Sequence, residues 1–312
     1  MPGTKAKIRQ KLFDKFSKSL VKICNDHNFE IIPPELLGKV EFPYSCPVCG
    51  NSYYETDLSS NSPNQLTIEH VPPECVGGKP LTLTCAECNK NSGSDFDLHL
   101  KLYMQYQFAA EGNVRIPVRT KVNDTINFKS QLVINKKKRS LRFYLSKKSK
   151  YAKEQIKNIS DNGLNYKINA ELNFGNQKKA EKALLKSVHL YAFSKFGYAY
   201  LQSVGGTYVR SELYNTNENI LKTMIITENI PVNEPGIYHC TINKKIEALM
   251  VFMSLSLSGN SKLIGTLLPG PYIESVEFYR TCDIDKQYQI DLQEIGFQDF
   301  NKKPYYFLEY FI

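Results

Sequence analysis

The sequence of 312 residues predicts an α+β protein, in which a small cysteine-rich module precedes a larger mixed α/β part rich in antiparallel strands. Two observations predict this class. Two Cys-x-x-Cys pairs bracket short apolar segments and turns between residues 46 and 97. After residue 113, short runs of β-branched and aromatic residues are interrupted by two stretches with helical periodicity.

The composition is that of a globular protein with an anionic partner. Hydrophobic residues make up 42% and charged residues 23% of the chain, which excludes the disordered class. The sequence contains no apolar run of membrane-spanning length and no secretory signal, so we expect a cytoplasmic protein without a membrane partner. The formal net charge of +9 favours nucleic acid as the partner.

Residues 1–36 are expected to form an N-terminal helical segment. Between residues 5 and 27, apolar side chains recur at helical spacing, and Lys and Arg fill the opposite face. This basic face is either a solvated surface or an arm that contacts phosphate groups. Pro33 and Pro34 end the segment and lead into the module expected over residues 37–112.

Four cysteines predict a structural zinc site in this module. In a reducing compartment, Cys-x-x-Cys pairs favour a metal over disulfides, because two thiolates from one turn reach the same ion. A shell of four sulfurs leaves no open coordination position, so this zinc would stabilise the fold. The expected ligands are Cys46, Cys49, Cys85 and Cys88. Two local disulfides and four buried thiols are the alternatives, and Cys75 is interpreted as a loop thiol.

Between the cysteine pairs, the sequence predicts strands over residues 66–70 and 81–84, joined by a loop rich in Pro and Gly. The second cysteine pair begins a helix, and a further helix is expected over residues 95–110. The predicted order is therefore strand, loop, strand and helix.

The ordered combination of these motifs resembles the HNH endonucleases, whose catalytic module is the ββα-metal fold. The resemblance covers about residues 46–97. It rests on Cys-Pro-Val-Cys-Gly, Glu-His-Val-Pro-Pro, Gly-Gly-Lys and Leu-Thr-Cys-Ala-Glu-Cys-Asn, in that order. It implies a metal-dependent DNA endonuclease that hydrolyses phosphodiester bonds, and by analogy a role in restriction or phage defence. Because one such site cuts one strand, a homodimer is the simple route to double-strand breaks.

The resemblance also implies roles for three residues. Glu69 would hold a catalytic divalent ion such as Mg²⁺, His70 would be the general base, and Asn89 would be the second protein ligand of the ion. The middle Asn of the family pattern falls near Pro80, where this chain departs from the pattern.

The residue types suit phosphodiester hydrolysis, which needs a base for the attacking water and oxygen ligands for a hard ion. Adjacent side chains of a strand point to opposite faces, so Glu69 and His70 converge only where the strand end is distorted, and the Pro-Pro turn is the expected cause. Alternative ligands are Asp95, Asp97 and His99, interpreted mainly as first-turn residues of the next helix.

Residues 113–312 are expected to form a C-terminal α+β domain for DNA recognition, ligand recognition or dimerisation. A meander of strands is predicted over 114–120, 125–135 and 140–147. Its basic turn is either a solvated loop or a contact to the DNA backbone. The candidate DNA-binding residues are Lys136, Lys137, Lys138, Arg139 and Arg142.

The remaining elements follow from periodicity and turn residues. A helix is expected over 177–203, ended by Gly205 and Gly206, and a second helix over 208–226. Strands are expected over 164–173, 236–242, 248–254, 262–268, 273–280 and 305–312. Tyr198, Tyr200 and Arg210 are candidates for the lining of a pocket, and core packing is the alternative for the two tyrosines.

Two other functions are compatible with the sequence. One is a zinc-stabilised nucleic-acid-binding protein without catalysis. The other is an effector nuclease gated by a ligand that binds within residues 113–312.

Overall fold

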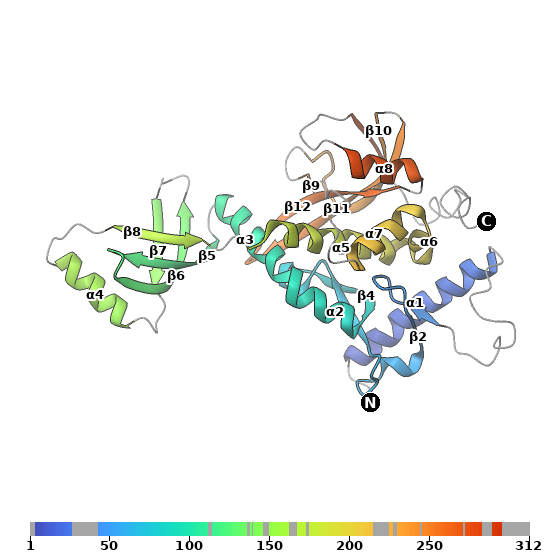
Figure 1. Cartoon of the computed structure of the whole chain (residues 1–312), viewed down its shortest axis with the longest axis horizontal. Coiled ribbons are helices and arrows are strands. Elements are labelled where there is room, and N and C mark those ends of the chain that lie inside the picture. The colour runs from blue at the N-terminus through green and yellow to red at the C-terminus, as the bar shows by residue number, and fades with distance from the viewer. Residues whose placement is uncertain are drawn as a thin grey trace.

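The computed structural model shows a mixed α/β protein with antiparallel sheets (Figure 1). It describes residues 4–26, 43–111, 114–135, 138, 140–145, 150–161, 167–172, 175–214, 225–226, 230–243, 245–270, 272–282 and 289–294. Over these residues the strands form two two-stranded ladders, one four-stranded sheet and one five-stranded sheet. The mixed class and its antiparallel pairing are as predicted.

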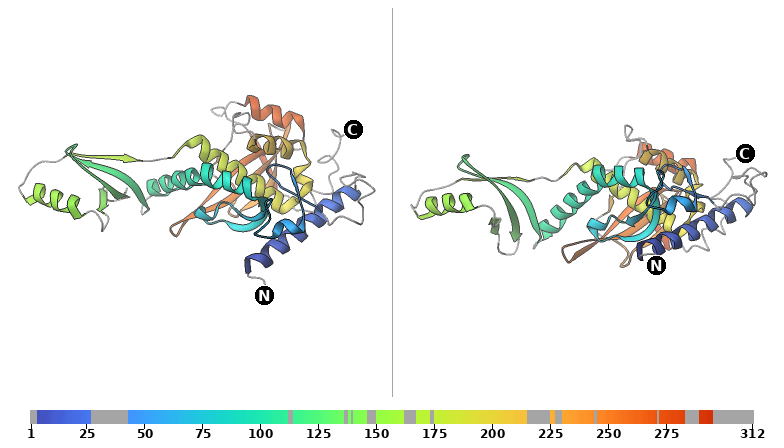
Figure 2. Two further views of the ribbon diagram at one scale, coloured as in Figure 1. Left: turned by 60° about the horizontal axis from the view of Figure 1, so that its bottom comes forward. Right: turned by 90° about the horizontal axis from the view of Figure 1, so that it is seen from below.

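The N-terminal helix α1, Thr4–Asp26, confirms the helix expected from the apolar periodicity. Its apolar stripe buries Phe13, Phe16 and Leu20, because side chains three and four residues apart share one helical face. This stripe packs against β1, β3, β4 and α6. Figure 2 shows α1 at the edge of the molecule, away from the small unit that contains α4.

The cysteine-rich module begins with two very short strands. β1, Tyr44–Ser45, pairs with β2, Ser52–Tyr53, and the turn between them carries the first cysteine pair. Gly50 has a φ of 80°, a conformation that a residue without a Cβ adopts freely, and this lets the turn close. A short 3₁₀ helix over Glu55–Leu58 follows.

The next elements have the order strand, loop, strand and helix that the sequence predicts. β3, Leu66–Val71, pairs antiparallel with β4, Lys79–Cys85, and α2 covers Ala86–Ser92. A π-helical turn over Gly93–Asp97 links α2 to α3, Leu98–Glu111. The helix expected over 95–110 is therefore present, although its first turn is π-helical.

A four-stranded antiparallel sheet follows, in the order β7-β6-β5-β8. Its strands are β5 (Arg115–Val122), β6 (Ile126–Asn135), β7 (Ser140–Leu145) and β8 (Ile168–Leu172), which confirms the predicted meander and strand. The sequence analysis missed α4, Lys150–Asp161, whose Ile156 packs against Val122 and Ile126. Figures 1 and 2 show this unit set apart from the rest of the molecule.

The helix expected over 177–203 is two helices, α5 (Gln177–Phe196) and α6 (Tyr198–Leu201). Gly197 separates them with a φ of 61°, and a Cβ there would lie 2.5 Å from Ser19 Oγ on α1. A side chain at this position would therefore push the helix end away from α1.

The prediction that Gly205 and Gly206 end a helix was wrong, because both lie inside α7, Val204–Tyr214. A Cβ on Gly205 would collide with the Pro269 carbonyl oxygen, and a Cβ on Gly206 with that of Tyr200. Both glycines thus serve close backbone packing instead of helix termination. A helix was expected over 208–226. The observed helix α7 begins earlier, at Val204, and ends at Tyr214, and Ile225–Ile226 form the short strand β9 instead.

A five-stranded antiparallel sheet has the order β13-β10-β11-β12-β9. Its long strands are β10 (Gly236–Ile242), β11 (Ile246–Leu257) and β12 (Asn260–Pro269), as predicted, and β13 (Ile290–Glu294) lies at one edge. The expected strand over 305–312 lies outside the described residues.

The prediction of a strand over 273–280 was wrong, because these residues form helix α8, Ile273–Thr281. The helix buries Val276 and Tyr279, which lie three residues apart and so share a helical face. Packing of this face against α7, β11 and β12 outweighs the β propensity of the segment.

Helix α5 is the centre of the core. It contacts α3 and the hairpin β3–β4 from the first part of the chain, and α7, β11 and β12 from the last part. One hydrophobic cluster contains residues from all these elements. After β8 the chain therefore returns to the cysteine-rich module and completes its core.

Candidate metal centre and catalytic site

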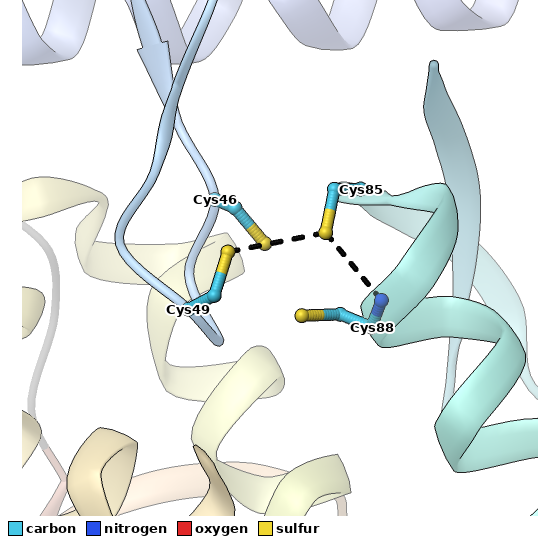
Figure 3. Close-up of side chains that lie close together, drawn as sticks. All are labelled: Cys46, Cys49, Cys85 and Cys88. Carbon is cyan, nitrogen blue, oxygen red and sulfur yellow. Dashed lines mark hydrogen bonds between the residues drawn. The ribbon is translucent and has the colours of Figure 1, made fainter. Parts of the chain in front are cut away.

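The four predicted zinc ligands lie together in the structure. The sulfur atoms of Cys46, Cys49, Cys85 and Cys88 are all within 4.8 Å of one another (Figure 3). The sulfurs of Cys49 and Cys85 are 3.9 Å apart. Zn–S bonds of about 2.3 Å place tetrahedral sulfurs roughly 3.8 Å apart, so the cluster is compatible with a structural metal site.

Two short turns supply these sulfurs. One pair lies in the turn between β1 and β2, and the other lies where β4 passes into α2, with the Cys85 sulfur accepting from the Cys88 amide. Hydrogen bonds from the other three thiols lower the pKa of Cys85, so the cluster stabilises a thiolate there. A bound metal requires all four thiolates. Cys75 lies apart and donates to the Asp97 carbonyl at 3.7 Å.

A buried histidine of α5 holds the first cysteine turn. His189 Nε2 lies 2.9 Å from the Pro47 carbonyl, and Nδ1 lies 2.9 Å from the Tyr200 hydroxyl. Burial lowers the pKa of His189 to about 4, so the ring is neutral at pH 7. Since a carbonyl only accepts, Nε2 carries the proton, and Nδ1 accepts from Tyr200.

Tyr198 and Arg210 complete this support. The Tyr198 hydroxyl accepts from the Ser45 amide and donates to the Ser45 carbonyl, both at 2.7 Å. A Cβ on Gly50 would lie 3.3 Å from Arg210 Nη1, so the guanidinium covers the turn. Burial lowers the pKa of Arg210, and the charges of Cys49 and Cys46 oppose this effect. These side chains therefore brace the cysteine cluster. Tyr198 and Tyr200 are fully buried, so core packing is the correct interpretation for the two tyrosines.

Glu69 is buried on the hairpin face that meets α5. Its Oε1 accepts from Lys186 Nζ at 2.8 Å, and its Oε2 accepts from Thr84 Oγ1 at 2.8 Å. The side chains of Lys186 and Glu69 are only 4% and 5% exposed. The sequence analysis missed Lys186. The available signal was its place within the helix expected over 177–203.

Asn89 lies against the same face of the hairpin. Its Nδ2 donates to Thr67 Oγ1 at 2.8 Å and to the Ile68 carbonyl at 3.2 Å. Thr67 and Glu69 are two residues apart on β3 and so share a face. The amide of Asn89 and the carboxylate of Glu69 are therefore brought to one side of the β3–β4 hairpin.

The β3–β4 ladder is irregular between Glu69 and His70, where β4 contains one extra residue. Glu69 pairs with Thr82 and His70 pairs with Pro80, which leaves Leu81 without a partner in the ladder. Such a bulge changes the local twist and redirects side chains. His70 is half-buried beside it.

Of the three alternative ligands, the structure brings Asp97 near Glu69. Burial raises the pKa of Asp97 to about 6, with Glu69 raising it further and Lys186 opposing. Its Oδ1 atom is buried and has no hydrogen-bond partner among the described residues. Asp95 is exposed, and His99 Nδ1 accepts from the Asn176 amide at 2.9 Å, at the start of α5.

Two of the five candidate DNA-binding residues, Lys138 and Arg142, are described, and both belong to the β6–β7 region of the four-stranded sheet. Lys138 and Arg142 are exposed, and the Lys138 amide donates to Asn135 Oδ1 at 2.9 Å. Lys136, Lys137 and Arg139 lie outside the described residues. Figure 1 shows the unit of β5–β8 away from β4 and α2.

No protein-family model, curated protein or solved structure matches this chain. Among the helices of the described part, none combines the length and apolar character needed to cross a membrane.

We expect replacement of Cys88 by Ser to remove a bound metal and to lower the melting temperature by about 10 °C or more. The reason is that the metal would join two segments whose own strands are very short. Metal content by mass spectrometry and thermal melting measure both effects. Cys240→Ser is the control, since this buried thiol lies outside the cluster. Equal metal content in wild type and Cys88→Ser would contradict the assignment.

We expect Asp97→Asn to stabilise the protein by roughly 1–2 kcal/mol at pH 7.5 without added divalent ions, and to have little effect at pH 4. The folded-state pKa of Asp97, about 6, lies above its ordinary value of 3.8. The folded state therefore binds the extra proton between these values, and stability falls as the pH rises through this window. Urea unfolding at both pH values measures the effect.

The exposed neighbour supplies the control for this experiment. Asp95→Asn removes the same charge from the same helical turn, and we expect it to leave the pH dependence unchanged. If Asp97→Asn lowers the stability of the protein equally at pH 4 and pH 7.5, then the charge of Asp97 does not destabilise the folded state.

Proposed function

We propose that this chain is a metal-dependent DNA endonuclease that hydrolyses phosphodiester bonds with His70 as the general base. The observation that carries the proposal is the convergence of Glu69 and Asn89 on one face of the β3–β4 hairpin, next to a bulge at His70. The resemblance of residues 46–97 to the HNH endonucleases supports the same roles. The four cysteines hold this arrangement, and their sulfur donors suit zinc.

The donor set around Glu69 fits a hard divalent ion such as Mg²⁺. A carboxylate has about four acceptor positions, and Lys186 and Thr84 use two of those on Glu69. The buried Asp97 Oδ1 has no partner among the described residues, so it offers a further oxygen ligand. Two carboxylates beside one ammonium leave excess negative charge, which a cation would neutralise.

The residues of the chain would then divide the reaction among them. His70 would take the proton of the attacking water. Asn89 would offer its amide oxygen, because its Nδ2 is turned toward β3 by two hydrogen bonds. Lys186 and Thr84 would fix the orientation of the Glu69 carboxylate. When bound, the divalent ion supplies charge relief on the phosphate and the leaving oxygen.

One observation favours a second candidate, a zinc-stabilised nucleic-acid-binding protein without catalysis. Both oxygens of Glu69 already accept hydrogen bonds, and its ion pair with Lys186 is almost completely buried. If Lys186 is the permanent counter-charge of Glu69, then no second cation is needed, and the hairpin only shapes a binding surface.

We expect the wild-type protein to nick supercoiled plasmid in the presence of Mg²⁺ or Mn²⁺, and His70→Ala to lower the rate by about 10²–10⁴-fold, because the water would lose its base. Gel analysis of plasmid conversion measures the rate. His239→Ala is the matched control, since that ring pairs with Glu247 on the five-stranded sheet.

Two results of this assay would contradict the proposed nuclease function. Equal nicking by wild type and His70→Ala would assign the activity elsewhere. Absence of nicking by wild type with every divalent ion tried would favour the second candidate.

We expect charge reversal of the basic turn to weaken DNA binding and to flatten its dependence on salt. Each lost phosphate contact lowers the slope of log affinity against log salt by about 0.9 for duplex DNA. The changes are Lys138→Glu and Arg142→Glu, two exposed residues of the β6–β7 hairpin. Fluorescence anisotropy with labelled duplex at several salt concentrations measures both quantities. Unchanged affinity and slope would identify this turn as a solvated surface.

A further inference from the structure

We propose that a lysine-rich groove beside the β3–β4 hairpin binds the phosphate of a nucleotide, in the first place one in the DNA strand that leads to the catalytic site. The groove has a volume of about 730 Å³ and is lined by residues from α1, the hairpin end, α5 and β11. This assignment extends the proposed nuclease function and rests on it for the identity of the strand.

Four lysines from three separate elements point to an anionic ligand. Lys11 and Lys15 lie one turn apart on α1, Lys79 begins β4, and Lys195 lies in the last turn of α5. No Asp or Glu occurs among the described residues that line the groove. A cleft lined by charges of one sign concentrates the field and attracts ions of the opposite sign.

The contacts within the groove show that three of these charges, those of Lys11, Lys15 and Lys195, are close together. Lys15 Nζ donates to the Ser194 carbonyl at 2.8 Å, which places it beside Lys195 on α5. Burial lowers the pKa of Lys15, and the charges of Lys195 and Lys11 lower it further. Because the lysines repel one another, a phosphate between them would relieve this repulsion on binding.

The rest of the lining suits the organic part of a nucleotide. Leu12, Val71, Pro72, Leu81 and Met253 supply apolar surface, and the half-buried Tyr191 supplies an aromatic ring. Bases and sugars bind such surfaces by stacking and apolar contact. The volume lies in the range of sites that hold small organic ligands and exceeds what a lone phosphate needs.

The position of the groove connects it with the proposed catalytic residue. Val71 and Pro72, which line the groove, directly follow His70 in the chain. The loop after them is held against β11, where a Cβ on Gly77 would lie 2.8 Å from the Ser256 Cβ. A DNA strand that occupies the groove would therefore contact Val71 and Pro72, the two residues that directly follow His70.

The test compares two sets of four Lys→Gln changes that remove equal charge. The groove set is Lys11→Gln, Lys15→Gln, Lys79→Gln and Lys195→Gln. The control set uses exposed lysines that are not among the described lining residues, and consists of Lys5→Gln, Lys153→Gln, Lys178→Gln and Lys245→Gln. Thermal melting establishes that both variants are folded.

Binding is measured by fluorescence anisotropy with labelled single-stranded and duplex DNA in buffer without divalent ions. We expect the groove set to weaken binding at least tenfold and to reduce the salt slope by about two or more, and the control set to change the affinity less than threefold. A second variant, with Arg at the four groove positions, should keep near wild-type affinity because the charge remains.

A second arm distinguishes the sources of the phosphate. Labelled adenosine monophosphate is titrated into wild type and into the groove set. Tight mononucleotide binding that only the groove set loses, with DNA binding unchanged, would assign the groove to a free nucleotide and overturn the assignment to a DNA strand. Equal binding of both ligands by the groove set and the control set would overturn the proposal entirely.

These results are independent of catalysis. Because binding is measured without divalent ions, a protein that never nicks DNA can still lose its DNA affinity in the groove set. Conversely, nicking that survives in the groove set at unchanged DNA affinity would remove the groove from the mechanism and leave the proposed nuclease intact.

Discussion

The cluster of four cysteine sulfurs is the constraint on which the module depends. The strands β1 and β2 have two residues each, and β3–β4 is a single hairpin, so neither ladder would be stable alone. The cluster joins the turn after β1 to the end of β4 and the start of α2. His189 then ties the same turn to α5 through the Pro47 carbonyl. One small cluster thus sets the position of the hairpin relative to the central helix.

The features that could be predicted from the sequence are local in the chain. Cysteine spacing indicated the cluster, and short runs of strand-forming residues bounded by turn residues indicated β3, β4 and the meander. Apart from α4, whose helical pattern is local, the features that were missed depend on distant contacts. Lys186 meets Glu69 across 117 positions, and no local pattern marks such a pair. In the same way, Gly205 and Gly206 by themselves are signals for the end of a helix. In the fold they lie inside α7 and allow the backbones of Pro269 and Tyr200 to approach closely. The helical conformation of α8 is likewise determined by its packing against α7, β11 and β12.

The chain beyond residue 113 contributes to the site in two ways. The unit of β5–β8 and α4 stands apart in Figure 1, and it contains the exposed residues Lys138 and Arg142. The segment from α5 onward instead returns to the module and supplies His189, Tyr198, Arg210 and Lys186. Because these side chains support the cysteine turn or contact Glu69, the predicted module of residues 37–112 would lack much of its core and its buried counter-charge without them. The candidate site is therefore built from two segments that are far apart in the sequence, the cysteine-rich module and the segment from α5 onward.

The charges around Glu69 are difficult to explain by stability alone. Burying an ion pair costs several kcal/mol per ion before the attraction is counted, and well-packed apolar residues often stabilise a protein as much. Here two carboxylates and one ammonium are placed in or near the interior, and one oxygen of Asp97 has no partner among the described residues. Burial raises the pKa of Asp97, and carboxyl groups perturbed in this way gather where chemistry or ion binding requires them. A fold that only needed to be stable would gain from replacing this cluster, so its presence beside the His70 bulge is the strongest physical argument that the hairpin has a chemical role.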